Sequence, residues 1–306
     1  MQKYFIGLFI SIIAVSFASI FILSCQAPPL SIAFYRLLFT TLLIVPLILI
    51  RKKTRDELIS LPRTTLLIMI VIGVILAAHF SFWVTSLRMT SVASSVILVT
   101  AHPMLVAPLS FYFLKEKLSW ANALGIAISL GGVGVLVIGN YGFAAFTLDT
   151  LEGNILALLG GIAAGLYILG GRTLRKKVST FTYAFVVYAV GTITLFFICL
   201  SLSAPLYNLT TVDYEIIILM AVVSGIFGHT LYNWSLGHIR ASVMSVALLG
   251  EPIGSSLLAF IIPQIVHVSW VAQIPSSFTI IGGSIILVGI YLTARTVKEV
   301  KFLEDI

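Results

Sequence analysis

Long apolar segments follow one another along almost the whole chain, and the polar and charged residues lie in the short stretches between them. A helix needs about 20 mostly apolar residues to cross the hydrocarbon core of a bilayer. The pattern therefore predicts an all-α integral membrane protein with ten transmembrane helices. Their expected spans are 4–23, 30–50, 64–87, 90–114, 120–139, 153–171, 180–202, 214–236, 241–262 and 277–297.

The predicted connections are too short to contain a soluble domain; the longest are 51–63, 140–152 and 263–276. The first apolar run could also be a signal peptide with a lipoprotein-type cleavage site before Cys25. Because a signal-peptide core has only about 7–15 residues, and 4–23 is long enough to span, we interpret it as a retained first helix.

The distribution of basic residues predicts the orientation. With the N-terminus in the cytoplasm, every Lys and Arg except Arg36 and Arg88 falls in or beside a cytoplasmic segment. Cytoplasmic loops of membrane proteins carry an excess of Lys and Arg. The predicted outer segments carry acids instead: Asp149, Glu152, Asp213 and Glu215. We therefore expect both termini in the cytoplasm, as an even number of helices requires.

Two parts of the chain resemble each other. Residues 79–109 align without gaps with 228–258, so that His102-Pro103 falls on Glu251-Pro252. Five helices are an odd number, so the second half would enter the membrane inverted, as in many secondary transporters. The expected organisation is a first five-helix repeat at 1–139, an outer loop at 140–152, an inverted repeat at 153–297 and a cytoplasmic tail at 298–306.

Several motifs, in this order, resemble the drug/metabolite transporter superfamily, and specifically its EamA family of ten-helix carriers. They are Phe34-Tyr35-Arg36-Leu37, Thr90-Ser91-Val92-Ala93-Ser94, Leu114-Lys115-Glu116-Lys117-Leu118, Gly228–Leu236 and Leu248-Leu249-Gly250-Glu251-Pro252. The resemblance covers essentially the whole chain and implies export of amino acids, other metabolites or drugs. The chain departs from the pattern at Pro263-Gln264, where the second half would usually repeat the helix-end glutamate, here Glu116.

Composition excludes several classes of protein. The 306 residues are 59% hydrophobic and 9% charged, whereas a soluble domain is about a quarter charged. The net charge of +7 comes from topology signals between the spans, so we expect no nucleic-acid partner. Cys25 and Cys199 belong to no metal-binding cluster, so we predict no metal and no cofactor. Both lie near predicted outer helix ends; two buried thiols are the favoured interpretation, with a disulfide as the alternative.

Glu251 lies in the middle of an apolar span and is followed by Pro252. A carboxylate at membrane depth is costly and is a candidate functional group, here for binding protons or substrate. The alternative is a structural acid bonded to a neighbouring helix or to backbone freed by Pro252. Since Pro103 occupies the matching place in the first half, we expect a helix break or hinge at both prolines.

His79, His102 and His229 lie within predicted spans. They could relay protons or contact a polar substrate, or simply hydrogen-bond between helices. Tyr232, Asn233, Trp83 and Tyr167 form a second group of candidates; Asn233 could hydrogen-bond across a cavity, and the aromatic rings could stack on a ligand, Tyr167 being named by family analogy. The alternative for the rings is an interfacial aromatic belt, which is favoured for Trp234.

Arg36 lies about a quarter of the way into the second span. We expect its side chain to extend outward to the interface, as long basic side chains do near helix ends. An inward-facing Arg36 would instead bind a substrate carboxylate. Glu116, between Lys115 and Lys117, is predicted to be a cytoplasmic helix-end charge or an inner gate contact.

These expectations predict a secondary transporter with a midplane cavity, in the cytoplasmic membrane of a prokaryote. Its partners would be a small-molecule substrate and the lipid bilayer, with protons as a candidate coupling ion. Glycines such as Gly125, Gly132, Gly282 and Gly289 indicate close helix packing within a monomer, or alternatively a homodimer. A channel-like facilitator is the alternative function. An enzyme is disfavoured, because Glu251 is the one acid well inside a span and no His-Glu-x-x-His sequence occurs.

Overall fold

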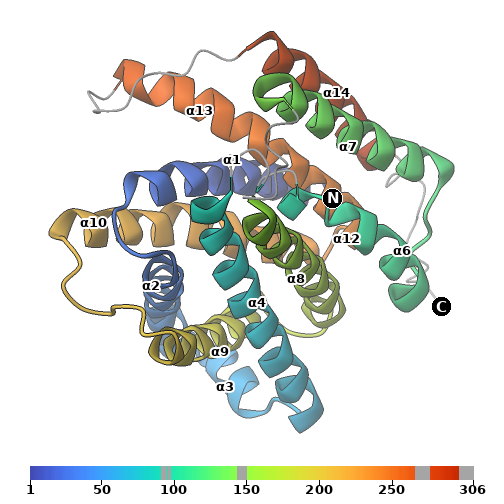
Figure 1. Cartoon of the computed structure of the whole chain (residues 1–306). Helices are drawn as coiled ribbons and strands as arrows, with labels where there is room; N and C mark the ends of the chain where they lie inside the picture. The colour runs from blue at the N-terminus through green and yellow to red at the C-terminus, as the bar shows by residue number, and fades with distance from the viewer. Residues whose placement is uncertain (91–94, 96–97, 143–149, 266–275, 296–306) are drawn as a thin grey trace, which may run out of the picture.

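The computed structural model describes residues 1–90, 95, 98–142, 150–265 and 276–295. These residues form helices joined by short turns, with no strand among them, which confirms the predicted all-α class (Figure 1). The loop and tail predicted at 140–152 and 298–306 lie largely or wholly outside the described residues.

The first part of the chain holds the helices α1 Gln2–Ser24, α2 Pro29–Ile50, α3 Lys52–Ile59, α4 Arg63–Met89, α6 Pro103–Leu114 and α7 Trp120–Tyr141. The second part holds α8 Leu151–Arg175, α9 Thr180–Ser201, α10 Thr211–Met220, α11 Leu231–Leu236, α12 Ala241–Ala247, α13 Glu251–Ile265 and α14 Ser277–Arg295. A π-helical segment, η3 Ala221–Thr230, joins α10 to α11, and a 3₁₀ turn, η4 Leu248–Gly250, joins α12 to α13.

Within the described chain, nine helices are long and apolar enough to cross a membrane. Their bounds agree with the predicted spans to about one helical turn. A further apolar helix, Leu98–Leu114, is shorter. The predicted fourth span, 90–114, includes residues 91–94 and 96–97, which lie outside the described residues. The count of ten therefore stays a prediction.

The predicted connection 51–63 contains the short helix α3, which was missed. The Glu57 carboxylate on α3 accepts the Ser179 backbone N–H at 2.9 Å and the Thr182 hydroxyl at 2.6 Å. Ser179 is the N-cap of α9, so Glu57 attaches α3 to the start of that helix. Burial raises the pKa of Glu57, but the hydrogen bonds from Ser179 and Thr182 outweigh this effect and leave it below its ordinary value.

Two of the predicted spans are not continuous α-helices. The span 214–236 contains η3, whose π-helical turns are wider than those of an α-helix. The span 241–262 is interrupted by η4, and α13 begins at Glu251 with Pro252 as its second residue. Likewise, α6 begins at Pro103. Both prolines thus lie in the first turn of a helix, where a missing N–H costs no intrahelical bond.

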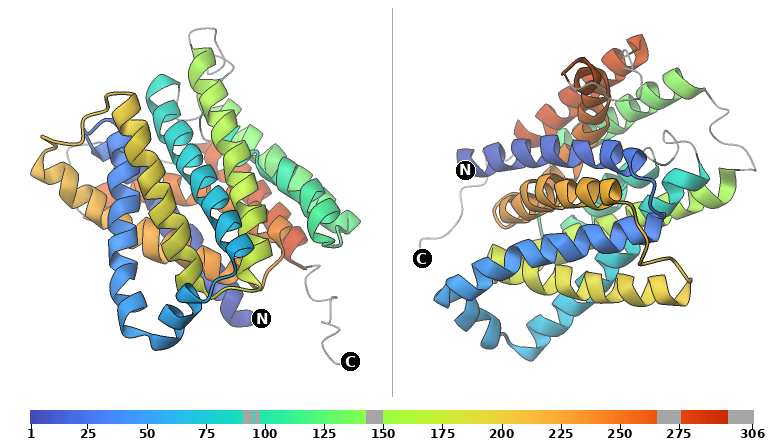
Figure 2. Two further views of the ribbon diagram at one scale, coloured as in Figure 1. Left: turned by 90° about the horizontal axis from the view of Figure 1, so that it is seen from below. Right: turned by 90° about the vertical axis from the view of Figure 1, so that its left-hand side faces the viewer.

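Two helices, α1 and α8, pack mainly on helices from the other part of the chain. Helices α2, α4, α8 and α9 lie side by side, with α4 against both α8 and α9 (Figure 2). Helix α8 also packs on α6, so its main neighbours belong to the first part. Helix α1 packs instead on η3, α13 and α11, all from the second part. The space between these two groups of helices becomes the centre of the molecule.

Helices α7 and α14 form a close pair at one side of the molecule (Figure 1). A Cβ atom added at Gly132 would lie 2.7 Å from the Gly282 carbonyl oxygen, and one added at Gly282 would lie 2.7 Å from that of Gly132. One added at Gly289 would lie 2.5 Å from the carbonyl oxygen of Gly125. These backbones touch directly, so the glycines serve packing within the chain.

Asp213, which the sequence places in a predicted outer segment, has a structural role that its position did not indicate. It is buried and accepts hydrogen bonds from the Gln26 backbone N–H at 2.8 Å and the Cys25 thiol at 3.2 Å. It also forms a capping box with Thr210 at the start of α10. One carboxylate therefore fixes the α1–α2 turn onto α10. Cys25 and Cys199 are free, buried thiols, as favoured from the sequence.

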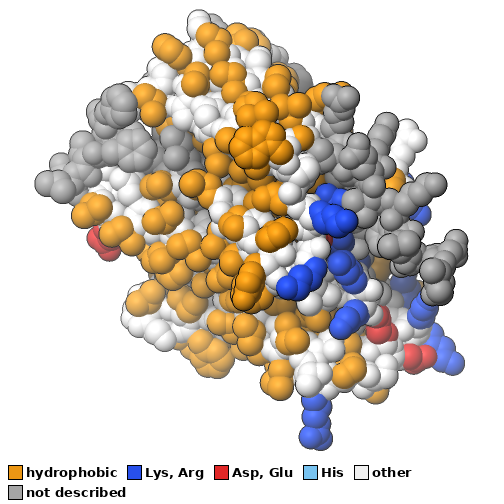
Figure 3. Space-filling model, turned by 90° about the vertical axis from the view of Figure 1, so that its right-hand side faces the viewer, with side chains coloured by type: hydrophobic (Ala, Val, Ile, Leu, Met, Phe, Trp, Pro, Cys, Tyr) orange, Lys and Arg blue, Asp and Glu red, His pale blue; other side chains and the backbone are white. Residues whose placement is uncertain are grey.

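The outer surface suits a lipid environment. Large apolar side chains are exposed along the helices, for example Phe9, Leu67, Phe197 and Leu287, each more than half exposed. Figure 3 shows a broad apolar region on one face, beside a band where Lys and Arg side chains gather. Apolar belts bordered by basic residues are typical of membrane proteins.

Candidate functional site

A cavity of about 380 Å³ lies among the helices at the centre of the molecule. Its wall includes residues of α1, α2, α4, α7, α8, η3, α11, η4 and α13, together with residues that precede α6. Much of this wall is apolar, for example Val15, Leu76, Val99 and Ile168. The volume lies within the range of small-molecule sites in proteins.

Most of the candidate residues predicted from the sequence line this cavity. They are Arg36, His79, Trp83, His102, Tyr167, His229, Tyr232 and Glu251, with Pro252 beside Glu251. Asn233 and Pro103 are not among the lining residues. Residues separated by more than 200 positions in the sequence therefore meet around one space.

Arg36 does not extend to the surface, so the expected outward orientation is wrong. Its side chain is 2% exposed and lines the cavity. Ile32 and Thr40, one helical turn away on each side, are also buried, which shows that this face of α2 points into the molecule. A side chain that extends through lipid to the interface would have to start from the opposite side of α2.

The guanidinium of Arg36 lies over the Phe80 ring, 4.6 Å from its centroid, in a cation–π contact. Its two terminal nitrogens, Nη1 and Nη2, have no hydrogen-bond partner among the described residues. Glu251 lines the same cavity and is close enough to interact with Arg36 electrostatically. In the described part of the chain, however, Arg36 and Glu251 form no ion pair.

The three histidines line the cavity, and the rings of His79 and His229 contact Phe80. Nδ1 of His79 lies 2.9 Å from the Gly160 carbonyl oxygen, and its ring is stacked on Trp83. Nδ1 of His102 lies 3.0 Å from the carbonyl oxygen of Val99. The His229 ring meets Phe80 edge to face. A carbonyl can only accept, so Nδ1 of His79 and His102 must each carry a hydrogen.

Trp83 and Tyr232 line the cavity, and each carries a buried polar atom. The Trp83 Nε1 and the Tyr232 hydroxyl are buried and find no hydrogen-bond partner in the part of the chain that the structure describes. Buried polar groups usually have a partner, because an unsatisfied one costs free energy. These two donors therefore lack a partner from the described chain, on residues that line the cavity.

Asn233 lies behind the wall rather than in it. Its Nδ2 donates to the Tyr167 hydroxyl at 2.6 Å and to the Tyr188 hydroxyl at 3.1 Å. The Tyr188 hydroxyl lies 3.3 Å from Oγ1 of Thr230. Asn233 thus orients Tyr167, whose ring lines the cavity. Sequence reasoning missed Tyr188, since a tyrosine in an apolar span looks like ordinary core.

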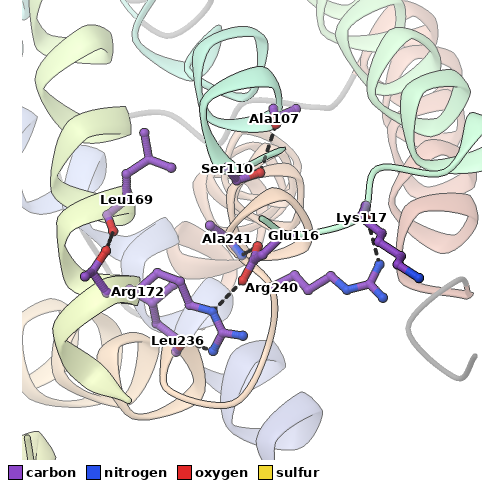
Figure 4. Close-up of polar contacts among 10 residues, drawn as sticks. Ala107, Ser110, Glu116, Lys117, Leu169, Arg172, Leu236, Arg240 and Ala241 are labelled. Atoms are coloured by element: carbon purple, nitrogen blue, oxygen red, sulfur yellow. Dashed lines mark hydrogen bonds and ion pairs between the residues drawn. The ribbon is translucent and has the colours of Figure 1, made fainter. Parts of the chain in front are cut away.

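A second polar group, which we call the Glu116 cluster, consists of Glu116, Arg172, Leu236 and Ala241 (Figure 4). Oε1 of Glu116 accepts from Nε of Arg172 at 2.7 Å, and Oε2 accepts the Ala241 N–H at 2.9 Å. Nη1 of Arg172 donates to the Leu236 carbonyl at 2.8 Å. The cluster joins the ends of α6, α8 and α11 to the first residue of α12.

The Glu116 cluster lies at one end of the bundle, away from the cavity. The Ser235 hydroxyl, one residue from the cluster, donates to the Tyr4 carbonyl in the first turn of α1. The cavity is lined by α1 only from Val15 onward, as far as Ser24. The helices are therefore tied together at the start of α1, while the cavity extends toward its end.

A multi-pass helical chain with charged groups around a central cavity has the organisation of a membrane transporter. Residues 3–138 and 151–295 match the sequence model of the EamA-like transporter family. The chain therefore belongs to the EamA-like transporter family, as the sequence motifs indicated.

Similar proteins agree with this assignment. An uncharacterized transporter of Archaeoglobus fulgidus is 24% identical over 275 residues, 88% of each chain. The uncharacterized transporter YyaM of Bacillus subtilis is 25% identical over 242 residues, 76% of this chain and 74% of YyaM. A probable terminal-alkyne amino-acid exporter of Streptantibioticus cattleyicolor is 20% identical over 202 residues, 65% of this chain and 63% of the exporter.

One solved structure, named only "Crystal structure of protein", superimposes with a TM-score of 0.78. The superposition covers 97% of this chain and 98% of that chain, at 18% identity. This likeness shows a shared fold.

Proposed function

We propose that the protein is a secondary transporter that moves a small metabolite, such as an amino acid, or a drug outward across the prokaryotic plasma membrane. The observation that carries the proposal is the central cavity, with one buried cation and one acid that are not paired with each other. Charged groups within a membrane protein mark substrate or ion pathways. The name of the S. cattleyicolor relative supports an amino-acid-like substrate and outward movement.

For the topology, we propose ten transmembrane helices in two inverted repeats, 1–139 and 153–297, with both termini in the cytoplasm. The separate family matches at 3–138 and 151–295 support the repeat. The asymmetric distribution of Lys and Arg supports the orientation. In this arrangement, the Glu116 cluster lies at the cytoplasmic end and holds it closed.

The proposed mechanism is alternating access, in which the cavity opens to one side of the membrane at a time. The helix starts at Pro103 and Pro252 border the cavity region and are suitable points for a change in helix direction. Disruption of the Glu116 cluster would open the cytoplasmic side, and closure near the end of α1 would seal the other.

The test is substrate counterflow. A thermal-shift screen of amino acids, nucleosides and quaternary amines identifies a ligand of the purified protein, because binding to the folded state raises its apparent stability. The protein is then reconstituted into liposomes loaded with the unlabelled ligand. We expect saturable uptake of the labelled ligand that exceeds equilibrium transiently. Unsaturable flux driven by voltage would show a channel instead and contradict the proposal.

Glu251→Gln tests proton coupling. We propose that Glu251 exchanges a proton during transport, in a cavity whose other ionisable lining residues are Arg36, His79, His102, His229, Tyr167 and Tyr232. The substitution is expected to flatten the dependence of transport on pH between about 5 and 8 while substrate binding is retained. The matched control is Glu215→Gln, because Glu215 is exposed. An unchanged pH profile in Glu251→Gln would exclude this role.

A further inference from the structure

The charge on Arg36 has no counter-charge in direct contact. The side chain is almost fully buried, and neither terminal nitrogen has a hydrogen-bond partner among the described residues. Burial of an unpaired cation costs solvation free energy even after the protein relaxes around it. The cation–π contact with Phe80 offsets only part of this cost. Arg36 therefore lacks a partner that the fold itself supplies.

The surroundings narrow down what that partner is. The other ionisable groups on the cavity wall include three histidines, which cannot serve as anions, and Glu251, which forms no ion pair with Arg36 in the described chain. The hydrogen-bond donors of Trp83 and Tyr232 are also free there. A cation and two neutral donors around one space favour a ligand that carries hydrogen-bond acceptors and a negative charge.

We propose that Arg36 is the anion-binding residue of the transport site and that it binds a carboxylate group of the substrate. A guanidinium presents two parallel N–H donors that match the two oxygens of a carboxylate. The apolar wall, which includes Leu76, Val99 and Ile168, receives the rest of the molecule. The substrate class is thus a small amphipathic carboxylate, and Arg36 determines the specificity. This inference rests on the proposed transport function.

The size of the cavity limits this class further. A volume of about 380 Å³ is near the lower end of the range for ligand sites, about 300–1,000 Å³. It accommodates a molecule of amino-acid size. N-acetyl-L-leucine and its amide are therefore suitable probes, because they have nearly the same shape and differ in the presence of the carboxylate.

The experiment measures the melting temperature of the detergent-purified protein during titration with each probe. In the wild type, we expect the acid to raise the melting temperature at concentrations at least tenfold lower than the amide. Arg36→Met, which keeps a side chain of similar length, is expected to abolish this preference. Arg36→Lys should retain part of it, since the charge remains but the paired donors are lost. Arg88→Met is the matched control, because Arg88 does not line the cavity.

The melting temperature without ligand separates a binding role from a structural one. If Arg36 is unpaired until an anion binds, the melting temperature of Arg36→Met should equal or exceed that of the wild type, because a buried unpaired charge has been removed. Glu251→Gln should keep the preference for the acid. A lower melting temperature of Arg36→Met with the preference intact would make Arg36 a structural residue and overturn the proposal.

Absence of any preference for the acid in the wild type would also overturn it. Counterflow decides the proposed function separately. If a substrate without an anionic group shows saturable counterflow that Arg36→Met leaves unchanged, transport stands while the role of Arg36 is refuted. If no compound shows counterflow but the acid still binds through Arg36, the binding site stands while the proposed transport is refuted.

Discussion

Glu116→Gln is expected to reduce the free energy of unfolding by roughly 3 kcal/mol, the lower end of the effect of removing one partner from a buried ion pair. The substitution removes the counter-charge of Arg172, whose side chain is 5% exposed and cannot gain water without rearrangement. Glutamine keeps one oxygen, so it can satisfy either Arg172 or the Ala241 N–H at the start of α12. Thermal and chemical unfolding of the detergent-purified protein measure the loss.

Lys117→Gln is the control for this variant, because Lys117 is the next residue on the same loop and its side chain is exposed. A change of no more than about 0.5 kcal/mol is expected there. The double variant Glu116→Gln with Arg172→Met should lose less stability than the sum of its two single variants, since neither charge is then left alone. Equal effects of Glu116→Gln and Lys117→Gln would show that the ion pair contributes nothing.

Gly132→Ala and Gly131→Ala are expected to change stability in opposite directions. A Cβ at Gly132 would lie 2.7 Å from a carbonyl oxygen of α14, and backbone atoms cannot move aside as a flexible side chain can. Overpacking of this kind costs about 1–3 kcal/mol, and Gly132→Leu should cost more. At Gly131, nothing lies within 4 Å of the added atom, so alanine should gain about 0.5–1 kcal/mol through its higher helix propensity.

The comparison is a ranking of melting temperatures: Gly131→Ala highest, then the wild type, then Gly132→Ala, with Gly132→Leu lowest. Because the two glycines are neighbours on α7, they lie at nearly the same depth, and the face of the helix on which each lies is the main difference between them. A loss of stability in Gly131→Ala as large as that in Gly132→Ala would mean that the Gly131 face of α7 is also packed, for instance in a homodimer. The assignment of these glycines to packing within the chain would then be incomplete.

The apolar pattern predicted most helix bounds because the membrane imposes a strong requirement. A span such as α2 or α9 must be about 20 apolar residues long, so its limits are visible in hydropathy alone. Helix α3 has no such signal, since its sequence is short and rich in charge. The π-helical segment η3 was equally invisible, because it is as apolar as an ordinary span and differs only in its hydrogen-bond register.

For the candidate site, the polar and aromatic candidates could be selected from the sequence, but the direction of each side chain could not. His79, Trp83 and Tyr232 were candidates for the cavity wall, and the structure brings them to one cavity. Arg36 was misjudged because its distance from the helix end was taken to decide its direction. The polar Thr40 four residues later marks the same buried face and could have indicated an inward orientation.

For Asp213 and Asn233, the sequence could not predict the hydrogen-bond partners. Their hydrogen-bond partners, at the α1–α2 turn and on α8 and α9, are distant in the sequence. No local pattern reports such pairings, which depend on the tertiary arrangement of helices. Composition could identify these residues as polar groups that need partners in the membrane, but it could not say that one holds a turn and the other the wall of a cavity.

Because α1 and α8 each pack on the other part of the chain, their contacts limit which helices can move together as a rigid body. Each of these helices begins one of the two segments that match the family, yet each packs mainly on the other segment. A motion that separated the segments at their boundary in the sequence would strip both helices of their neighbours at once. In the proposed alternating-access motion, the moving bodies would therefore be composite, with α1 travelling with η3, α11 and α13, and α8 travelling with α4 and α6. The α1–α2 turn would then be one connection between these bodies, because it joins α1 to a helix that packs on α4 and α9.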